Sequence, residues 1–309
     1  MNVTSLIADA AALAANWETT PFISTGLGDF DAVFSVETVE RLIGSGTLPI
    51  PDIRLFQDGT QLPVSRCARP GARFGGQRER LVDGAAVERE IASGATLAVE
   101  EVQTFSPEVG GFAAELAAET GCVVYCTAFV TPAGGHGVRP HYDPTSVFIR
   151  QVYGAKRWRV SQPVQRWPSI LWSDAQDVDT EVVLETELRA GQCLYIPRGF
   201  VHCGTATGEA SVHLAVNLAP PTWASVLRRL ADTALDAEPM REALPPDYHR
   251  MDPAKLRALL AERLAQLGAR LGELGEGPDT DRALAKALPR TAPPALAPGS
   301  LRAALGGEP

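Results

Sequence analysis

Three side chains with metal-binding chemistry occur in a suggestive order: His141, Asp143 and, far along the chain, His202. Two imidazoles and one carboxylate can occupy one face of an octahedral metal ion and leave three adjacent coordination positions open. A bidentate cosubstrate and dioxygen need those three positions together, so the set predicts the iron(II) centre of an oxygenase. A His-x-Asp pair is common by chance, so this prediction depends on the surrounding sequence.

The residues around the first pair predict extended backbone. Side chains two positions apart on a strand point to the same side, so His141 and Asp143 reach one ion if residues 139–145 are extended. Pro140 and Pro144 flank the pair and disfavour a helix there.

The second histidine ends a segment with its own turn signals. Residues 191–202 read Gly-Gln-Cys-Leu-Tyr-Ile-Pro-Arg-Gly-Phe-Val-His, a predicted strand closed by Pro197 and turned by Gly199 before it delivers His202. The alternative is structural: His202 caps a strand end and His141 is a loop histidine with satisfied hydrogen bonds. Either histidine alone favours that alternative, whereas both together in these contexts favour the metal site.

Lys156 is the next candidate. The chain has 28 Lys and Arg in total, and lysine occurs only at positions 156, 255 and 286. On the predicted strand 155–162, Lys156 shares its face with Trp158, and an unpaired charge buried on an apolar face costs several kcal/mol. The distal carboxylate of 2-oxoglutarate would be a partner for the amine. The alternative is a solvated basic strand that includes Arg157 and Arg159.

From about Asn16 to Trp223 the chain resembles the JmjC-domain 2-oxoglutarate oxygenases, and within them the ribosomal oxygenase group of cupin-like hydroxylases. The matching motifs are Pro140-His-Tyr-Asp143, Val147-Phe-Ile-Arg-Gln151, Gly154-Ala-Lys-Arg-Trp-Arg-Val160 and the segment 191–202. The resemblance implies that His141, Asp143 and His202 hold Fe(II), with 2-oxoglutarate and O2 as cosubstrates. It also implies that Lys156, fifteen positions after His141, binds the cosubstrate as the family's lysine or arginine does.

The chain departs from the family at two cosubstrate positions. Relatives carry a tyrosine twelve positions before the first histidine, and this chain has Phe129, without a hydroxyl. Either Thr127 or another group compensates, or the cosubstrate is held more loosely. Near the end of the last barrel strand, where relatives place a small polar residue, Asn217 can donate or accept a hydrogen bond. His213, on the same predicted face, either supports the site or is a core histidine.

The resemblance implies an enzyme that hydroxylates a side chain of a peptide or protein and forms succinate and CO2. Alternatives are a JmjC-type demethylase and a hydroxylase of a free amino acid or natural-product precursor. Less favoured are a cosubstrate-free cupin enzyme, which commonly uses three histidines and a glutamate, and a non-catalytic binding module. The complete ligand set and Lys156 count against both.

Composition limits the environment and the partners. No apolar run is long enough to cross a membrane, and no secretory signal is indicated, so we expect a cytoplasmic protein. Its 5 cysteines lack zinc-finger spacing, which suits reduced thiols. The net charge of −9 belongs wholly to residues 1–219, which argues against nucleic acid as a partner. An arginine-rich stretch, 65–84, is either a solvated loop or a cover for an acidic substrate.

Breakers and periodicity predict a mainly β fold: a double-stranded β-helix (jelly-roll, cupin, JmjC) core with an N-terminal α/β leader and a C-terminal helical region. The expected domains are a leader at 1–94, the barrel at 95–222, and helices at 223–309 with a flexible Pro-rich tail from Pro289. A helix is predicted from Pro107 to about Thr120, with Ser106 as its N-cap and Gly121 at its end. A turn is predicted at Tyr153-Gly154. Leucines spaced four and three apart form a heptad seam that packs within the chain or pairs two subunits. Related proteins dimerise through helices here, so we expect a homodimer. The seam comprises Leu260, Leu264, Leu267, Leu271 and Leu274.

Overall fold

The computed structural model describes residues 2–71, 80–169, 180–276 and 280–288. The chain divides into two compact units, one with the described residues up to Ala219 and the other beginning at Pro220. The predicted flexible tail and part of the arginine-rich stretch, including Arg73 and Arg78, lie outside the described residues.

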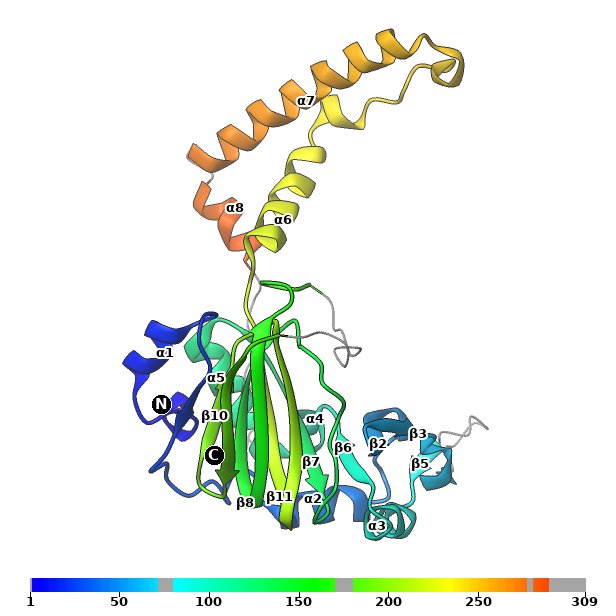
Figure 1. Cartoon of the computed structure of the whole chain (residues 1–309). Coiled ribbons are helices and arrows are strands. Elements are labelled where there is room, and N and C mark those ends of the chain that lie inside the picture. Colours follow the sequence, from blue (N-terminus) through cyan, green and yellow to red (C-terminus); the bar gives the residue numbers. More distant parts are fainter. Residues whose placement is uncertain (1, 72–79, 170–179, 277–279, 289–309) are drawn as a thin grey trace, which may run out of the picture. The chain divides into compact units, whose positions relative to one another are not determined.

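The first unit is built on one large antiparallel sheet (Figure 1). Within the described residues its strands run in the order β1 (Phe22–Ser24), β10 (Cys193–Ile196), β8 (Ser146–Pro163), β11 (Phe200–Ala219), β7 (Val123–Thr131), β6 (Thr96–Val99), β2 (Ile53–Gln57) and β3 (Thr60–Leu62), and β9 (Val182–Arg189) pairs with β8. The predicted leader and barrel therefore share a sheet, and the boundary between them stays a prediction.

Two long strands, β8 and β11, organise the barrel and lie side by side in Figure 1. The first half of β8 pairs with β10 and with the second half of β11. The second half of β8 pairs with β9 and with the first half of β11. Each strand thus contributes to both walls, which is how a double-stranded β-helix closes. Apolar side chains of both walls form a buried cluster that includes Ile149, Trp158, Val160 and Ala215.

The turn predicted at Tyr153-Gly154 is wrong, because β8 continues through both residues. Gly154 has φ 62°, and a Cβ there would lie 1.8 Å from the carbonyl oxygen of Ala210. Opposite it, the pairing register of β11 shifts between Ala206 and Ser211. The glycine that suggested a turn instead lets two strands bend together and stay paired.

Helices cover the sheet, and capping signals set their ends. The predicted helix at 107–120 is confirmed as α5 (Pro107–Thr120): the Ser106 side chain accepts a hydrogen bond from the Val109 N–H, and Gly121 ends the helix with φ 68°. The other α-helices described in the first unit are α1 (Ala10–Asn16), α2 (Val36–Gly44), α3 (Gly84–Ala92) and α4 (Val102–Phe105), and β4 (Ala68–Pro70) pairs with β5 (Arg80–Val82). Leader helices and the sheet share the main hydrophobic core.

The second unit contains α6 (Trp223–Leu235), α7 (Pro253–Glu276) and α8 (Thr280–Ala287). The predicted leucine seam lies on α7. Its C-terminal end packs within the unit, where buried Leu274 contacts Ala234 of α6. Leu260 and Leu264 at the other end are each 57% exposed. Among the described residues, no helix is both long and apolar enough to span a membrane.

The bend in β8 gives a stability prediction. We expect Gly154→Ala to lower the free energy of unfolding by about 3 kcal/mol, because the new Cβ meets a strand backbone and the left-handed conformation is strained. Gly121→Ala is the matched control, since Gly121 has a similar φ of 68° with nothing within 4 Å of its Cβ position. The free energy of unfolding of Gly121→Ala should fall by roughly 1 kcal/mol. Urea unfolding measures both, and equal losses would contradict the proposed backbone collision.

Candidate active site

The two predicted histidine ligands face each other across an isolated β-bridge. The His141 N–H donates to the His202 carbonyl at 3.2 Å, and the His202 N–H donates to the His141 carbonyl at 2.8 Å. Two residues on, the Gly199 N–H donates to the Asp143 carbonyl at 3.0 Å. Residues 139–145 form no named strand, so the predicted extended segment is reduced to this bridge. It still holds both ligand-bearing segments in register.

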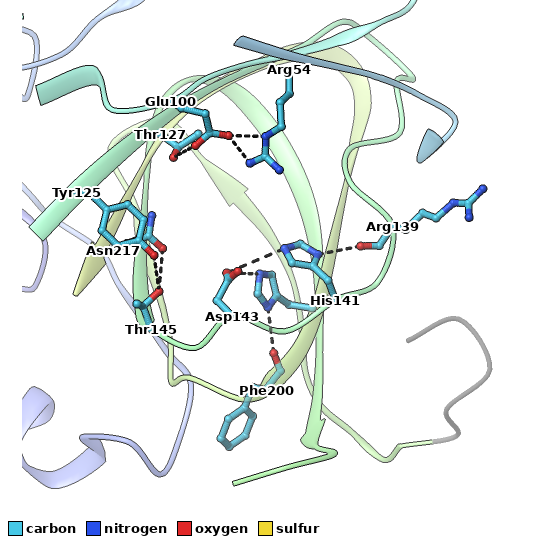
Figure 2. A network of polar contacts seen from close by, with 11 residues as sticks. Arg54, Glu100, Tyr125, Thr127, Arg139, His141, Asp143, Thr145, Phe200 and Asn217 are labelled. Atoms are coloured by element: carbon cyan, nitrogen blue, oxygen red, sulfur yellow. Dashed lines mark hydrogen bonds and ion pairs between the residues drawn. The ribbon is translucent and has the colours of Figure 1, made fainter. Parts of the chain in front are cut away.

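Backbone carbonyls also orient the two imidazole rings. Nδ1 of His141 donates to the Arg139 carbonyl at 2.8 Å, and Nδ1 of His202 donates to the Phe200 carbonyl at 3.0 Å (Figure 2). A carbonyl oxygen can only accept, so each ring carries its proton on Nδ1 and presents the lone pair of Nε2. This is the tautomer that a metal ligand requires.

Asp143 completes the set. Its Oδ2 lies 3.5 Å from Nε2 of His202 and 4.0 Å from Nε2 of His141. One ligand atom from each of the three residues lies within 4.8 Å of the others. Burial, with the nearby His141, lowers the pKa of His202 to about 4, so its imidazole is neutral and free to coordinate. The donor set and its orientation fit a divalent cation such as iron(II).

The metal-binding set opens into a cavity of about 560 Å³ inside the barrel. Lys156 lines this cavity and is 2% exposed, on the buried face of β8 as the sequence predicted. Its Nζ donates to the Thr131 hydroxyl at 3.0 Å, and no described carboxylate pairs with it. Burial lowers the pKa of Lys156 to about 7. The solvated alternative is therefore wrong: the amine is desolvated and lacks an acidic protein partner.

Two glycines leave room for this amine. A Cβ at Gly137 would lie 3.2 Å from Nζ of Lys156, and a Cβ at Gly204 would lie 2.9 Å from its Cε. The Gly137 N–H donates to the Gly204 carbonyl at 3.1 Å, so the two backbones are joined where they pass the lysine. Any larger residue at either position would displace the amine.

The other predicted cosubstrate residues also line the cavity, with different partners. The Thr127 hydroxyl donates its one proton to Glu100 at 2.8 Å, so it cannot also donate to a carboxylate. It therefore does not replace the tyrosine hydroxyl that Phe129 lacks. Asn217 accepts from the Thr145 hydroxyl through Oδ1 at 3.2 Å, which leaves its amide N–H groups as donors toward the cavity.

Sequence analysis missed a polar group on the leader side of the cavity. Glu100, at the end of β6, pairs with Arg54 of β2 as well as with Thr127 (Figure 2). Tyr125 also lines the cavity and shares a hydrogen bond with Thr145 at 3.2 Å. Alternation along β7 was the available signal, because residues 125, 127 and 129 share one face. Nothing local identified Arg54 or Glu100, which arrive through pairing of leader strands.

Known proteins resemble the central part of this chain in sequence. Residues 99–226 match the JmjC domain model. The chain is 31% identical over 188 residues to ribosomal oxygenase 1 of Homo sapiens, covering 55% of this chain and 29% of that protein. It is also 31% identical over 176 residues to a bifunctional lysine-specific demethylase and histidyl-hydroxylase of Brugia malayi, covering 53% and 25%. The chain thus spans about a quarter to a third of the length of these relatives.

Solved structures support the same fold. A ribosomal oxygenase of Escherichia coli, YcfD, aligns with a TM-score of 0.54 at 21% identity, over 88% of this chain and 68% of that one. The same protein solved with cobalt and 2-oxoglutarate aligns with a TM-score of 0.51 at 22% identity, over 87% and 67%. The matched region has the fold and the His-Asp-His set of a JmjC domain, and the chain is similar in sequence to ribosomal oxygenases.

The ligand set gives a binding prediction. We expect Asp143→Ala to weaken Mn²⁺ binding by about 100-fold or more, because removing a direct ligand should cost at least as much as removing a residue that orients one. Isothermal titration calorimetry measures the change. His249→Ala, at an exposed position in the second unit, is the control and should bind as the wild type does. Unchanged affinity in Asp143→Ala would remove this residue from the site.

Proposed function

We propose that this chain is an oxygenase dependent on iron(II) and 2-oxoglutarate that hydroxylates a side chain of a peptide or protein. Succinate and carbon dioxide are the co-products. The observation that carries the proposal is the combination, in one cavity, of a complete His141, Asp143 and His202 ligand set with a buried amine that pairs with no carboxylate among the described residues. A metal and a dicarboxylic acid fit those two features together.

The chain's own residues hold and orient the reactants. The Nε2 atoms of His141 and His202, with the Asp143 carboxylate, would hold the ion beside the cavity. Lys156 would pair with the distal carboxylate of 2-oxoglutarate, and the Asn217 amide would offer it hydrogen-bond donors. Iron(II) with 2-oxoglutarate supplies the oxidative decarboxylation that activates dioxygen for insertion into a C–H bond. No side chain needs to act as a general acid or base.

The names of the relatives support a polypeptide substrate. They include ribosomal oxygenases and a combined lysine demethylase and histidyl-hydroxylase. Hydroxylation is our first choice, and demethylation of a methylated lysine is the second, because that bifunctional relative's name covers both reactions. The mass of the product peptide separates them: hydroxylation adds one oxygen atom, whereas demethylation removes a methyl group.

We further propose that the protein acts in the cytoplasm. All five cysteines, including the partly exposed Cys203, are free thiols in the structure. Free thiols suit a reducing compartment.

Turnover provides the direct test. The purified protein with iron(II), 2-oxoglutarate and ascorbate should form succinate, and His141→Ala should abolish this product because one of the three ligands is lost. Succinate can be quantified by mass spectrometry, with His249→Ala as the matched histidine control. Succinate formation by His141→Ala at the wild-type rate would refute the assigned centre.

Lys156 makes cosubstrate binding depend on pH. Its pKa of about 7 leaves the amine charged below pH 7 and neutral above it. Pairing with a carboxylate favours the charged form, so binding above pH 7 must take up a proton. The Kd for 2-oxoglutarate should therefore rise by up to about tenfold per pH unit above pH 7. Calorimetry in buffers of different ionisation enthalpy measures both affinity and proton uptake.

A matched variant isolates the amine. Lys156→Arg keeps its charge across this range, so its Kd should not follow the same pH dependence. If the wild-type Kd for 2-oxoglutarate stays constant between pH 7 and pH 9, Lys156 does not pair with the carboxylate.

We also propose that the exposed part of the α7 seam joins two copies of the chain. Leu260 and Leu264, four positions apart on one helix face, are each 57% exposed, although leucine is usually buried. Leu260→Glu combined with Leu264→Glu should convert a dimer to a monomer in sedimentation velocity. Leu244→Glu, at a position 61% exposed outside the helix, is the control and should leave the dimer intact. A monomeric wild type would contradict the proposal.

A further inference from the structure

Three nitrogen groups belong to side chains that line the cavity, and none of them pairs with a carboxylate among the described residues. Besides Lys156, they are Nε1 of Trp158 and Nδ1 of His213. Both of these atoms are buried, and neither has a hydrogen-bond partner among the described residues. All three side chains line the same cavity. Buried polar atoms are seldom left unpaired, so their concentration here indicates an acceptor that comes from outside the chain.

His213 is held in place on two sides. Its ring stacks on Phe129, its partner across β7 and β11, with centroids 5.0 Å apart and planes 14° apart. The edge of the ring meets Trp158 of β8, with centroids 5.5 Å apart and an interplanar angle of 79°. Neighbours from two strands therefore fix the orientation of an imidazole that is itself 1% exposed. This ring needs no rearrangement to receive a ligand.

The charge state of His213 suits an anionic ligand bound by Lys156. Burial, and then the positive charge of Lys156, lower the pKa of His213 well below its usual value. The imidazole is therefore neutral at physiological pH and has one N–H to donate. A neutral donor beside a cation can share a carboxylate with it, whereas two buried cations would repel each other.

We infer that His213 is a cosubstrate-binding residue: it donates a hydrogen bond to the distal carboxylate that Lys156 pairs with, and Trp158 Nε1 supplies a further donor. This inference deepens the proposed function and rests on it. Phe129 cannot make such a bond, so the donor comes from the neighbouring strand at the same level of the barrel. Thr127 cannot supply it either, because its proton goes to Glu100.

The competing explanation is that His213 only fills the core, and the two explanations differ in what an apolar ring would do. His213→Phe keeps an aromatic ring against Phe129 and Trp158 but removes both nitrogens. If His213 only packs, ligand binding should be unchanged. If it binds the carboxylate, the variant should lose affinity for 2-oxoglutarate while its melting temperature stays the same or rises, because an unpaired buried atom is gone.

Calorimetry on the Mn²⁺-loaded protein tests this without turnover. The two probes are 2-oxoglutarate and 2-oxopentanoate, which has a methyl group in place of the distal carboxylate. We expect His213→Phe to weaken 2-oxoglutarate binding by about 10- to 100-fold, the range for one hydrogen bond to a charged group. Binding of 2-oxopentanoate should change less than threefold or so. His213→Gln, which retains an N–H donor, should recover most of the lost affinity.

The possible outcomes distinguish failure of the inference about His213 from failure of the proposed function. If wild type and His213→Phe bind 2-oxoglutarate equally well, the inference about His213 is overturned and the proposed function stands. An equal loss for both probes would also overturn the inference, because the ring would then act through the shape of the site. If the Mn²⁺-loaded wild type does not bind 2-oxoglutarate, the proposed function falls together with the inference.

Discussion

A buried ammonium group without a protein acid is the constraint on which the rest of this site depends. Lys156 lies inside the barrel with a threonine hydroxyl as its hydrogen-bond partner, and burial lowers its pKa to about 7. Desolvation of this kind destabilises the folded chain unless an anion is supplied. Gly137 and Gly204 give the amine its space, and the side chain of Lys156 is 2% exposed. The cavity is therefore organised for an anionic ligand.

In the metal-binding set, backbone hydrogen bonds position the imidazole rings of His141 and His202. One bridge aligns His141 with His202, and carbonyl oxygens of residues two positions earlier hold both rings through Nδ1. Neither ring depends on a side-chain partner to set its tautomer. A protein carboxylate near each Nδ1 would add negative charge to the centre, and a carbonyl does not. Asp143 is then the one anionic ligand that the chain contributes to the set.

Sequence patterns were sufficient where the determinants are local. Spacing and turn residues predicted the three side chains that the structure brings together as a possible metal site. The scarcity of lysine with strand alternation singled out the buried Lys156, and capping signals placed α5 correctly. Non-local features could not be predicted. Gly154 appeared to be a turn because its partner, the irregular part of β11, lies more than fifty residues away. Strand register, which no single segment encodes, likewise determines two further contacts. Phe129 pairs with His213, and the Thr127 hydroxyl donates its hydrogen bond to Glu100.

The isolated bridge between His141 and His202 also has a consequence for how the protein matures. The two ligand segments are sixty-one positions apart, and β8 lies between them in the sequence. No subset of the chain synthesised before His202 can present all three ligands. Contacts of such large sequence separation are associated with slow folding. The complete ligand set therefore exists only once the two segments have joined, after His202 has been synthesised.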